Sequence, residues 1–341
     1  MKSPGLLLFL LLTLTGCLPS SCQRQESQAL FASDSLSRRL AEAVPADSSL
    51  RLGWRTTGTA EHPLAYPRTV RFGPDGLLYV GDVERASIFV FDGDGAFVRE
   101  VTADVFDVPY LAGFLADTLV VFDPSGLRLD LVAGDVVVRS IAVEAEPQRG
   151  ALVYAAAAGG AFYFKQVGHD VEGYLARLGA DGRVDARQAL AGPYWRYAGQ
   201  LRPWGDSLLS LSGYRPVVDV VSGEPTGTLV LDTLALTGFD SPMLARSRSF
   251  ALGEVGQAPL LSSSAAPAGE LLFVLNLRPG WLQLDAFDHA GRLQRRLAQT
   301  APDYQKDFFP QDLAVRRRDD GTYEAAVVFK TPEPRLDLYR F

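Results

Sequence analysis

The sequence has very little cysteine. Its 341 residues include only Cys17 and Cys22, both close to the N-terminus. The rest of the chain therefore cannot form a disulfide, a zinc–thiolate site or a cysteine nucleophile. Exported proteins commonly use disulfides, so a body without them must obtain its stability from a hydrophobic core. With 47% hydrophobic residues, the chain can form such a core.

Lysine, asparagine and long apolar runs are also scarce. The chain has four lysines against 29 arginines, a single asparagine (Asn276) and a net charge of −7. A net negative charge argues against nucleic-acid binding by phosphate neutralisation. The apolar run over residues 5–14 is far shorter than the roughly 20 residues of a permanent membrane span.

The N-terminus has the pattern of a cleaved export signal. Lys2 precedes the apolar run, which ends in Leu14-Thr15-Gly16-Cys17. This ending resembles the bacterial lipobox, and the resemblance implies cleavage before Cys17 and lipidation, including palmitate, of that cysteine. Leu18 rather than aspartate follows it, which by the same resemblance implies the outer membrane. The alternative is an ordinary signal peptide with an incidental cysteine.

The composition divides the chain into three parts. We expect a lipoprotein signal peptide at 1–16, a lipid-anchored flexible tether at 17–49 and a folded body at 50–341. A flexible tether of this length reaches about 30 Å from the membrane. Apolar residues between Leu30 and Val44 have roughly helical spacing. They predict one short helix that lies against the body or, alternatively, acts as a lid over a binding face.

Residues 67–101 read as four strands joined by turns. Val70 and Phe72 alternate with polar neighbours, and apolar runs follow at 78–80 and 88–91. The turns contain Asp75-Gly76 and the run Asp-Gly-Asp-Gly at 92–95. The segment resembles an NHL-type β-propeller repeat, which implies a four-stranded antiparallel blade.

Weaker copies of this plan fill the remaining body. The turn between first and second strands recurs at Asp75-Gly76, Ala116-Asp117, Gly159-Gly160, Gly205-Asp206, Ala268-Gly269 and Asp320-Gly321. Six units predict an all-β, six-bladed β-propeller. The last unit lacks an outer strand, so we expect residues 50–56 to close the ring. An insertion near 223–257 leaves a seven- or eight-bladed count as the alternative.

The ends of the second strands would share one face of such a propeller. Together with nearby loop residues they give the candidate ligand-binding set Asp82, Asp123, Lys165, His169, Trp195, Arg215, Asn276, Arg278 and Lys330. Its cations could receive a carboxylate or phosphate. The alternative is a solvated rim of salt bridges. Similarly, the aromatic cluster at 194–197 fits either a binding surface or packing between blades.

The sequence favours a binding module over an enzyme. No nucleophile elbow, phosphate loop or dinucleotide fingerprint is present. We therefore predict no catalytic residue, metal or cofactor, and an envelope protein that binds another envelope protein or a small anionic ligand. The alternative is a metal-dependent hydrolase or lyase resembling the six-bladed calcium lactonases. That family implies acidic and asparagine ligands, for which only Asp82, Asp123 and Asn276 are available, with His169 as a further candidate.

Overall fold

The computed structural model describes residues 34–144, 150–205, 207–223, 228–299 and 308–341. The proposed signal peptide, Cys17, Cys22 and the first half of the tether lie outside these residues. No helix within the described part of the chain is long and apolar enough to cross a membrane.

Four separate antiparallel sheets of four strands each follow one another along the described chain. The first contains β2 (Pro67–Phe72), β3 (Leu78–Asp82), β4 (Ser87–Phe91) and β5 (Phe97–Thr102), and the second β6 (Tyr110–Leu115), β7 (Thr118–Asp123), β8 (Arg128–Ala133) and β9 (Val136–Ala142). The third contains β10 (Leu152–Ala158), β11 (Ala161–Val167), β12 (Tyr174–Leu178) and β13 (Val184–Ala189), and the fourth β14 (Leu201–Trp204), β15 (Ser207–Leu211), β16 (Val217–Gly223) and β17 (Leu229–Ala235).

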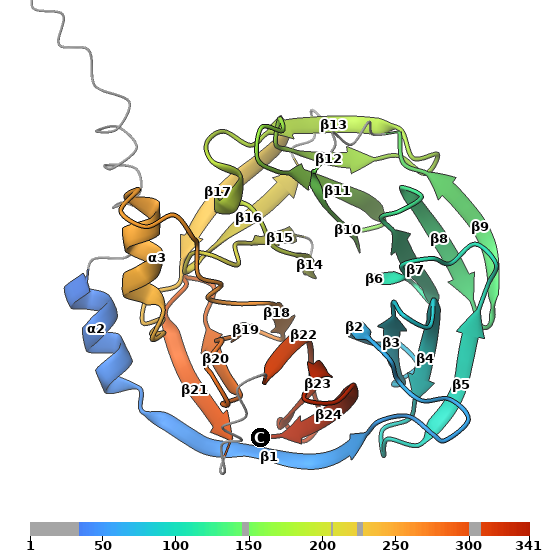
Figure 1. Ribbon diagram of the computed structural model, residues 1–341, viewed down its shortest axis with the longest axis horizontal. Helices are drawn as coiled ribbons and strands as arrows, with labels where there is room; N and C mark the ends of the chain where they lie inside the picture. The colour runs from blue at the N-terminus through green and yellow to red at the C-terminus, as the bar shows by residue number, and fades with distance from the viewer. Residues whose placement is uncertain (1–33, 145–149, 206, 224–227, 300–307) are drawn as a thin grey trace, which may run out of the picture.

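The remaining strands form one eight-stranded sheet with the order β18-β19-β20-β21-β1-β24-β23-β22. They are β1 (Ala46–Thr56), β18 (Ala265–Ala268), β19 (Leu271–Leu275), β20 (Gln283–Phe287), β21 (Leu293–Gln299), β22 (Phe309–Arg317), β23 (Tyr323–Thr331) and β24 (Arg335–Arg340). All five sheets stand around a common centre in a propeller-like arrangement (Figure 1). The predicted all-β fold of four-stranded antiparallel sheets is therefore confirmed.

The long strand β1 joins the two halves of the eight-stranded sheet. Its first part pairs in parallel with β21, from Ala46 opposite Arg296, and its second part pairs antiparallel with β24, from Arg51 opposite Arg340. This confirms that residues 51–56 form the strand outside β24. The indole N–H of Trp54 also donates to Gly93 O over 2.9 Å. The N-terminal strand therefore fastens the last sheet to the first one.

Short turns and apolar strands explain the local structure. The predicted turn at Asp75-Gly76 lies between β2 and β3, where Gly76 has a φ of +80° that favours glycine. Apolar side chains then fill the spaces between neighbouring sheets. Phe122 of β7, for example, meets Phe164 of β11 edge-on with ring centroids 6.2 Å apart. The core is therefore distributed around the ring between the sheets.

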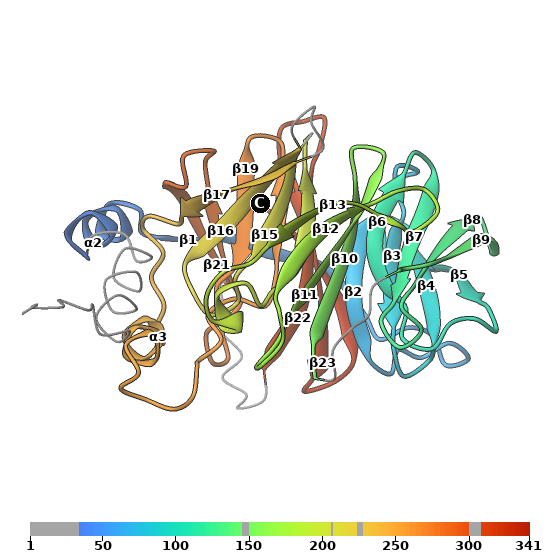
Figure 2. The same cartoon turned by 90° about the horizontal axis from the view of Figure 1, so that it is seen from above.

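Two helices lie at the periphery of the ring (Figures 1 and 2). Helix α2 (Asp34–Ala43) confirms the expected short helix, and α3 (Leu244–Ala251) lies in the region of the expected insertion. The backbone N–H of Gly238 donates to Ser37 Oγ of α2 over 3.0 Å. Arg296 of β21 donates to Ala41 O of α2 over 3.2 Å. Helix α2 thus packs against the side of the body and does not cover its centre.

Candidate functional site

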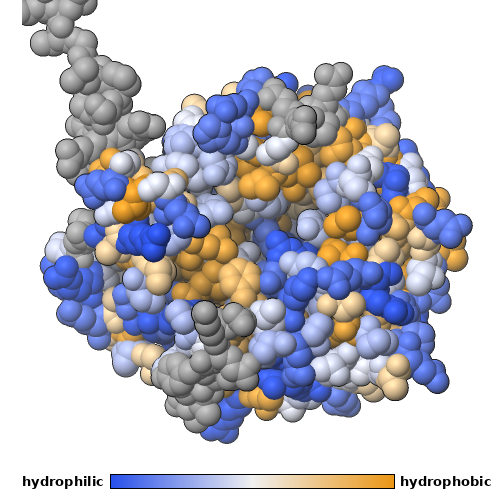
Figure 3. All heavy atoms as spheres, viewed as in Figure 1, coloured by the Kyte–Doolittle hydropathy of each residue, from blue (hydrophilic) through white to orange (hydrophobic). Residues whose placement is uncertain are grey.

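The first strand of each four-stranded unit lies nearest the centre of the ring. These inner strands are β2, β6, β10, β14, β18 and β22 (Figure 1). A cavity of about 220 Å³ opens where they begin, and its polar and aromatic lining includes Arg68, Arg71, Tyr110, Tyr154, Gln200, Arg202, Tyr214, Phe309 and Gln311. We call this cavity the upper chamber. The face in Figure 3 is hollowed near its middle.

Irregular strand pairing aims several of these side chains at the upper chamber. Side chains three residues apart point to opposite faces of a regular strand. Arg68 and Arg71 nevertheless both line the chamber, because the pairing of β2 with β3 shifts register between Pro67 and Thr69. Strand β22 shifts register around Pro310 as well. Bulges of this kind re-aim side chains near functional sites.

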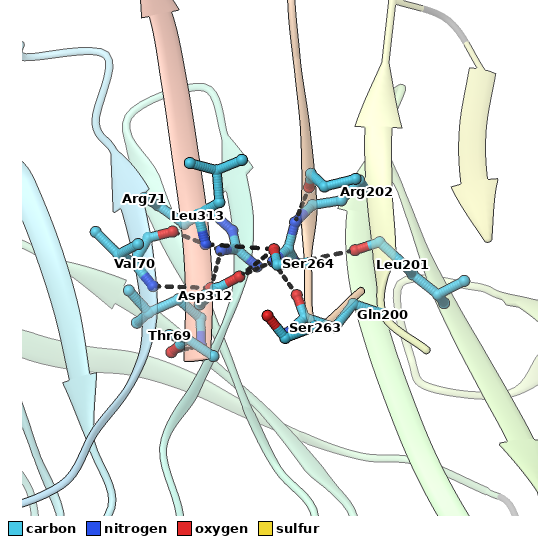
Figure 4. Close-up of polar contacts among 12 residues, drawn as sticks. Thr69, Val70, Arg71, Gln200, Leu201, Arg202, Ser263, Ser264, Asp312 and Leu313 are labelled. Carbon is cyan, nitrogen blue, oxygen red and sulfur yellow. Dashed lines mark hydrogen bonds and ion pairs between the residues drawn. The ribbon is translucent and has the colours of Figure 1, made fainter. Parts of the chain in front are cut away.

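A buried ion cluster forms the floor of the upper chamber (Figure 4). Asp312 of β22 is fully buried and accepts a hydrogen bond from Arg71 Nη1 over 2.8 Å and another from Arg202 Nη2. It also accepts from Ser264 Oγ over 2.6 Å and from the backbone N–H of Val70 over 3.0 Å. The cluster therefore connects β2, β14, β22 and the residue just before β18 across the centre.

The electrostatics of the cluster keep its members charged. Burial alone would raise the pKa of the Asp312 carboxyl, but Arg202 and Arg71 lower it below its usual range. Burial lowers the pKa of the Arg202 guanidinium to about 9. This group therefore remains protonated at neutral pH.

The upper chamber has an excess of positive charge. Three arginines line it, whereas no aspartate or glutamate is among its described lining residues. The carboxylate of Asp312, beneath the floor, offsets one of the three charges. Within the described residues, Arg71 makes its hydrogen bonds through Nη1, and Arg68 donates through Nη1 to Gln311 and forms a side-chain hydrogen bond with Tyr110. The site thus keeps guanidinium donors available for an anion.

This arrangement is suited to a carboxylate or a phosphate. The planar guanidinium matches both groups in a forked geometry, and such charge-assisted bonds are roughly twice as strong as neutral ones. Tyr110, Tyr154, Tyr214 and Phe309 supply flat walls beside the arginines. The chamber can therefore hold a small anion by its charge and by its shape.

The two predicted acidic residues hold loops in place. Asp82 is fully buried and accepts hydrogen bonds from the backbone N–H groups of Ala65 and Tyr66 over 2.8 and 2.9 Å. Asp123 accepts from Asp107 N over 2.9 Å and from Ser125 Oγ over 2.7 Å. Both carboxylates end a second strand, as expected, but neither lines the upper chamber.

Lys165 is buried behind the wall of the upper chamber. Its Nζ donates to Tyr197 O over 2.8 Å and to Ser210 Oγ over 2.9 Å, and it lies 4.8 Å from the ring centroid of Tyr154. Burial lowers its pKa to about 7, while Asp219 opposes this shift. Tyr154 itself lines the chamber, whereas Lys165 does not.

Asn276 and Arg278 both bind the loop at Asp240. Asn276 Nδ2 donates to Asp240 O over 2.6 Å and to the buried Asp285 Oδ2 over 2.7 Å. Burial raises the pKa of that Asp285 carboxyl. Arg278 Nη2 donates to Asp240 O over 2.7 Å. Lys330 at the rim pairs with Glu84 over 2.6 Å and lies over the ring of Tyr66.

The aromatic cluster packs against α3. The 3-10 helix η1 (Tyr194–Arg196) places the Trp195 ring edge-on to Phe250, with centroids 5.3 Å apart. Arg215 is buried, lies 5.9 Å from the Trp195 ring and donates to Arg196 O. His169 is exposed and contacts Asp170 over 2.6 Å. Within the cluster, Trp195 thus packs against α3, while Tyr197 belongs to the apolar core between the third and fourth sheets.

Of the nine predicted residues, the structure brings together Trp195 with Arg215 and Asn276 with Arg278, and none of the nine lines the upper chamber. The described residues contain no group of three His, Cys, Asp or Glu side chains that could hold a metal ion. Arg68, Arg71 and Arg202 were not among the predicted residues, because the prediction rested on the ends of the second strands. The available signal was arginine within the inner strands, at Pro67–Phe72 and Leu201–Trp204.

Comparisons with known proteins give structural relatives alone. No family model matches the sequence, and no curated protein does. Virginiamycin B lyase from Staphylococcus aureus is similar with a TM-score of 0.52 and 10% identity, covering 86% of this chain and 88% of that one. Regucalcin from Agrobacterium tumefaciens, described as a calcium-binding protein, has a TM-score of 0.53 and 12% identity over 86% and 95%. The WD40 repeats of RRP9 have a TM-score of 0.51 and 10% identity over 87% and 98%. At such identities the likeness concerns the fold, and the fold of this chain is a β-propeller.

Proposed function

We propose that this chain is a lipid-anchored β-propeller of the bacterial cell envelope that binds a small carboxylate or phosphate in the upper chamber. The observation that carries the proposal is the convergence of Arg68, Arg71 and Arg202 on one cavity, with a single buried carboxylate to offset them. Excess positive charge in an enclosed site attracts and orients an anion. The chemistry is the one expected from the sequence, at residues that differ from the predicted ones.

The proposal includes the architecture expected from the repeats. We count the eight-stranded sheet as two blades that share β1, which together with the four separate sheets gives six blades of the NHL type. The count rests on the strand order, because β21 and β24 each pair with a different part of β1. The propeller then begins at Ala46, where β1 starts, rather than at the expected residue 50, and α2 lies at the end of the tether.

Anchoring rests on the sequence Leu14-Thr15-Gly16-Cys17 and on Leu18. A lipidated Cys17 would hold the propeller at the outer membrane without a spanning helix. Metabolic labelling with an alkyne analogue of palmitate tests this directly in the full chain. Label on the wild type that disappears in Cys17→Ser supports the anchor. Equal labelling of both, or of neither, contradicts it.

The lyase and regucalcin relatives keep a metal-dependent hydrolase or lyase as the second candidate class, but a shared fold does not carry a shared activity. The contacts of the candidate ligands favour binding. Asp82 and Asp123 are occupied by backbone N–H groups, and Asn276 is turned toward Asp240 and Asp285. The channel presents guanidinium groups, which repel a metal cation.

Isothermal titration of the purified chain with succinate and with inorganic phosphate tests the binding site. Arg68→Gln removes an upper-chamber guanidinium. It should lower the affinity for at least one of these anions by about tenfold to a hundredfold, because a hydrogen bond to a charged group contributes about 1.5–3 kcal/mol. Arg278→Gln at the rim is the matched control and should leave the affinity within about twofold. Absence of binding for both anions, or equal effects of the two variants, would refute the assignment.

A further inference from the structure

A second cavity lies on the other side of the ion cluster. It has a volume of about 320 Å³, and we call it the lower chamber. The upper chamber is lined near the beginning of the inner strands, for instance by Arg68 and Tyr110. The lower chamber is lined near their ends, for instance by Phe72 and Phe114. The two chambers therefore open at opposite ends of the central channel.

The lower chamber is apolar apart from its floor. Its only charged lining residues within the described chain are Arg71 and Arg202, which the upper chamber also contacts. Phe72, Phe114 and Leu313 are part of its walls, and small residues such as Ala158 leave it open. The walls of the lower chamber thus differ from those of the upper chamber, which contain tyrosines and glutamines.

The floor of the lower chamber is cationic. Two guanidiniums face one carboxylate in the ion cluster, so one positive charge remains uncompensated there. Arg202 uses Nε and both terminal nitrogens in contacts with Ala265 O, Leu201 O and Asp312. Arg71 makes its hydrogen bonds to Val70 O and to Asp312 through Nη1, so none of the hydrogen bonds among the described residues engages its Nη2. Arg71 is therefore the group that would receive a ligand.

These features define one class of ligand. An anionic head satisfies the buried guanidinium, while an apolar body gains about 25 cal/mol per Å² of surface removed from water. A cavity of 320 Å³ has room for on the order of ten non-hydrogen atoms at about 30 Å³ each, the share of a water in the liquid. A medium-chain carboxylate such as octanoate meets these requirements of size, charge and apolar surface.

We propose that the lower chamber is a second binding site, which takes a medium-chain carboxylate with its head at Arg71 and its tail between Phe72, Phe114 and Ala158. This site goes beyond the proposed function because its walls belong to the opposite mouth of the channel. The two sites meet at Arg71 and Arg202, so the upper chamber selects polar anions and the lower chamber selects apolar ones.

Titration of the purified chain with monomeric octanoate, octanol and succinate tests this site. Ala158→Leu places three additional carbons in the lower chamber. It should lower the affinity for octanoate at least tenfold and leave the affinity for succinate within twofold. Arg68→Gln, which alters the upper chamber alone, should have the reverse pattern. Phe114→Ala is a second variant that removes a wall, and it should weaken octanoate threefold to tenfold. Unfolding midpoints of all variants identify those that fail to fold.

The outcomes separate the two proposals. Octanoate affinity that falls by these factors in Ala158→Leu or Phe114→Ala, with octanol binding at least tenfold more weakly than octanoate, supports the lower site even where succinate fails to bind. No binding of octanoate would overturn the inference. Equal affinity for octanol and octanoate would overturn the role of Arg71, and octanoate affinity unchanged in both folded wall variants would place the ligand elsewhere.

Discussion

Replacing Asp312 should lower the stability of the propeller and increase its affinity for anions. Asp312→Asn preserves the side-chain volume but removes the negative charge that pairs with Arg71 and Arg202. Both guanidiniums are then left without a counter-charge, Arg202 being buried and Arg71 largely so. Stability and ligand affinity are expected to change in opposite directions, which a purely structural role for the cluster would not predict.

The magnitude follows from the burial of the pair. Removing one partner of a buried ion pair costs about 3–5 kcal/mol because the other charge remains buried and uncompensated. Natural domains are stable by about 5–15 kcal/mol, so the variant retains only part of its stability. The Asp312 carboxylate repels an anion bound in the upper chamber. Removing this negative charge at roughly 6 Å from the anion makes binding more favourable by about 0.7–1.4 kcal/mol at an effective dielectric constant of about 40–80. The affinity should therefore rise about threefold to tenfold.

Guanidinium chloride unfolding followed by tryptophan fluorescence measures the first effect, and titration with succinate measures the second. Asp94→Asn, a neutralised exposed carboxylate in a turn, is the matched control and should change stability by less than about 0.5 kcal/mol. A combined Arg71→Met, Arg202→Met and Asp312→Leu variant should recover most of the lost stability, because apolar replacement of a buried ion cluster is often neutral. It should also bind no succinate.

The reasoning would be refuted by a loss of stability below about 1 kcal/mol in Asp312→Asn, since a buried pair cannot be broken so cheaply. It would also be refuted by weaker succinate binding in a variant that remains folded. In that case Asp312 would be orienting the arginines for the ligand rather than competing with it.

Three further predictions concern other parts of the account. Deletion of residues 46–56 uncovers the edges of β21 and β24, so it should abolish cooperative thermal unfolding; a normal transition in calorimetry would contradict closure by β1. Because burial lowers the pKa of Lys165 to about 7, the unfolded chain binds more protons than the folded one between about pH 7 and 10, and the free energy of unfolding rises with pH there. Lys165→Met should lower that slope by up to about 1.4 kcal/mol per pH unit, and denaturant titrations with identical slopes would disprove this. Arg278→Glu combined with Lys330→Glu should leave succinate affinity within about twofold, because both cations pair at the rim; a tenfold loss would return the site to the predicted residues.

Much of the fold could be predicted because its signals are local. The turn at Asp75-Gly76 and the apolar run that became β3 are close together in sequence. The closing strand could be predicted as well, because the last unit lacked a strand and residues 50–56 had strand character. In contrast, the region near 223–257 gave no secure pattern, and it contains β17 and α3.

The site was harder to predict because its determinants are not local. Arg202 and Asp312 are 110 residues apart and meet only after the ring has closed. The bulge between Pro67 and Thr69 directs Arg68 into the channel, and alternation of apolar residues does not reveal it. Asp82 and Asp123 do end their second strands, but neither lines the upper chamber. Their side chains are used to hold neighbouring loops, which residue type alone could not indicate.

The central claim is that the channel arginines bind an anion, and anomalous diffraction from crystals soaked in selenate tests it most directly. Selenate resembles phosphate in size and charge, and its selenium can be located without reference to the protein. We expect an anomalous peak in the upper chamber, placed so that the selenate oxygens lie within hydrogen-bonding distance of Arg68 and Arg71, and we expect its loss in Arg68→Gln. Peaks confined to the rim near Arg278 or Lys330, or no peak in the channel, would contradict it.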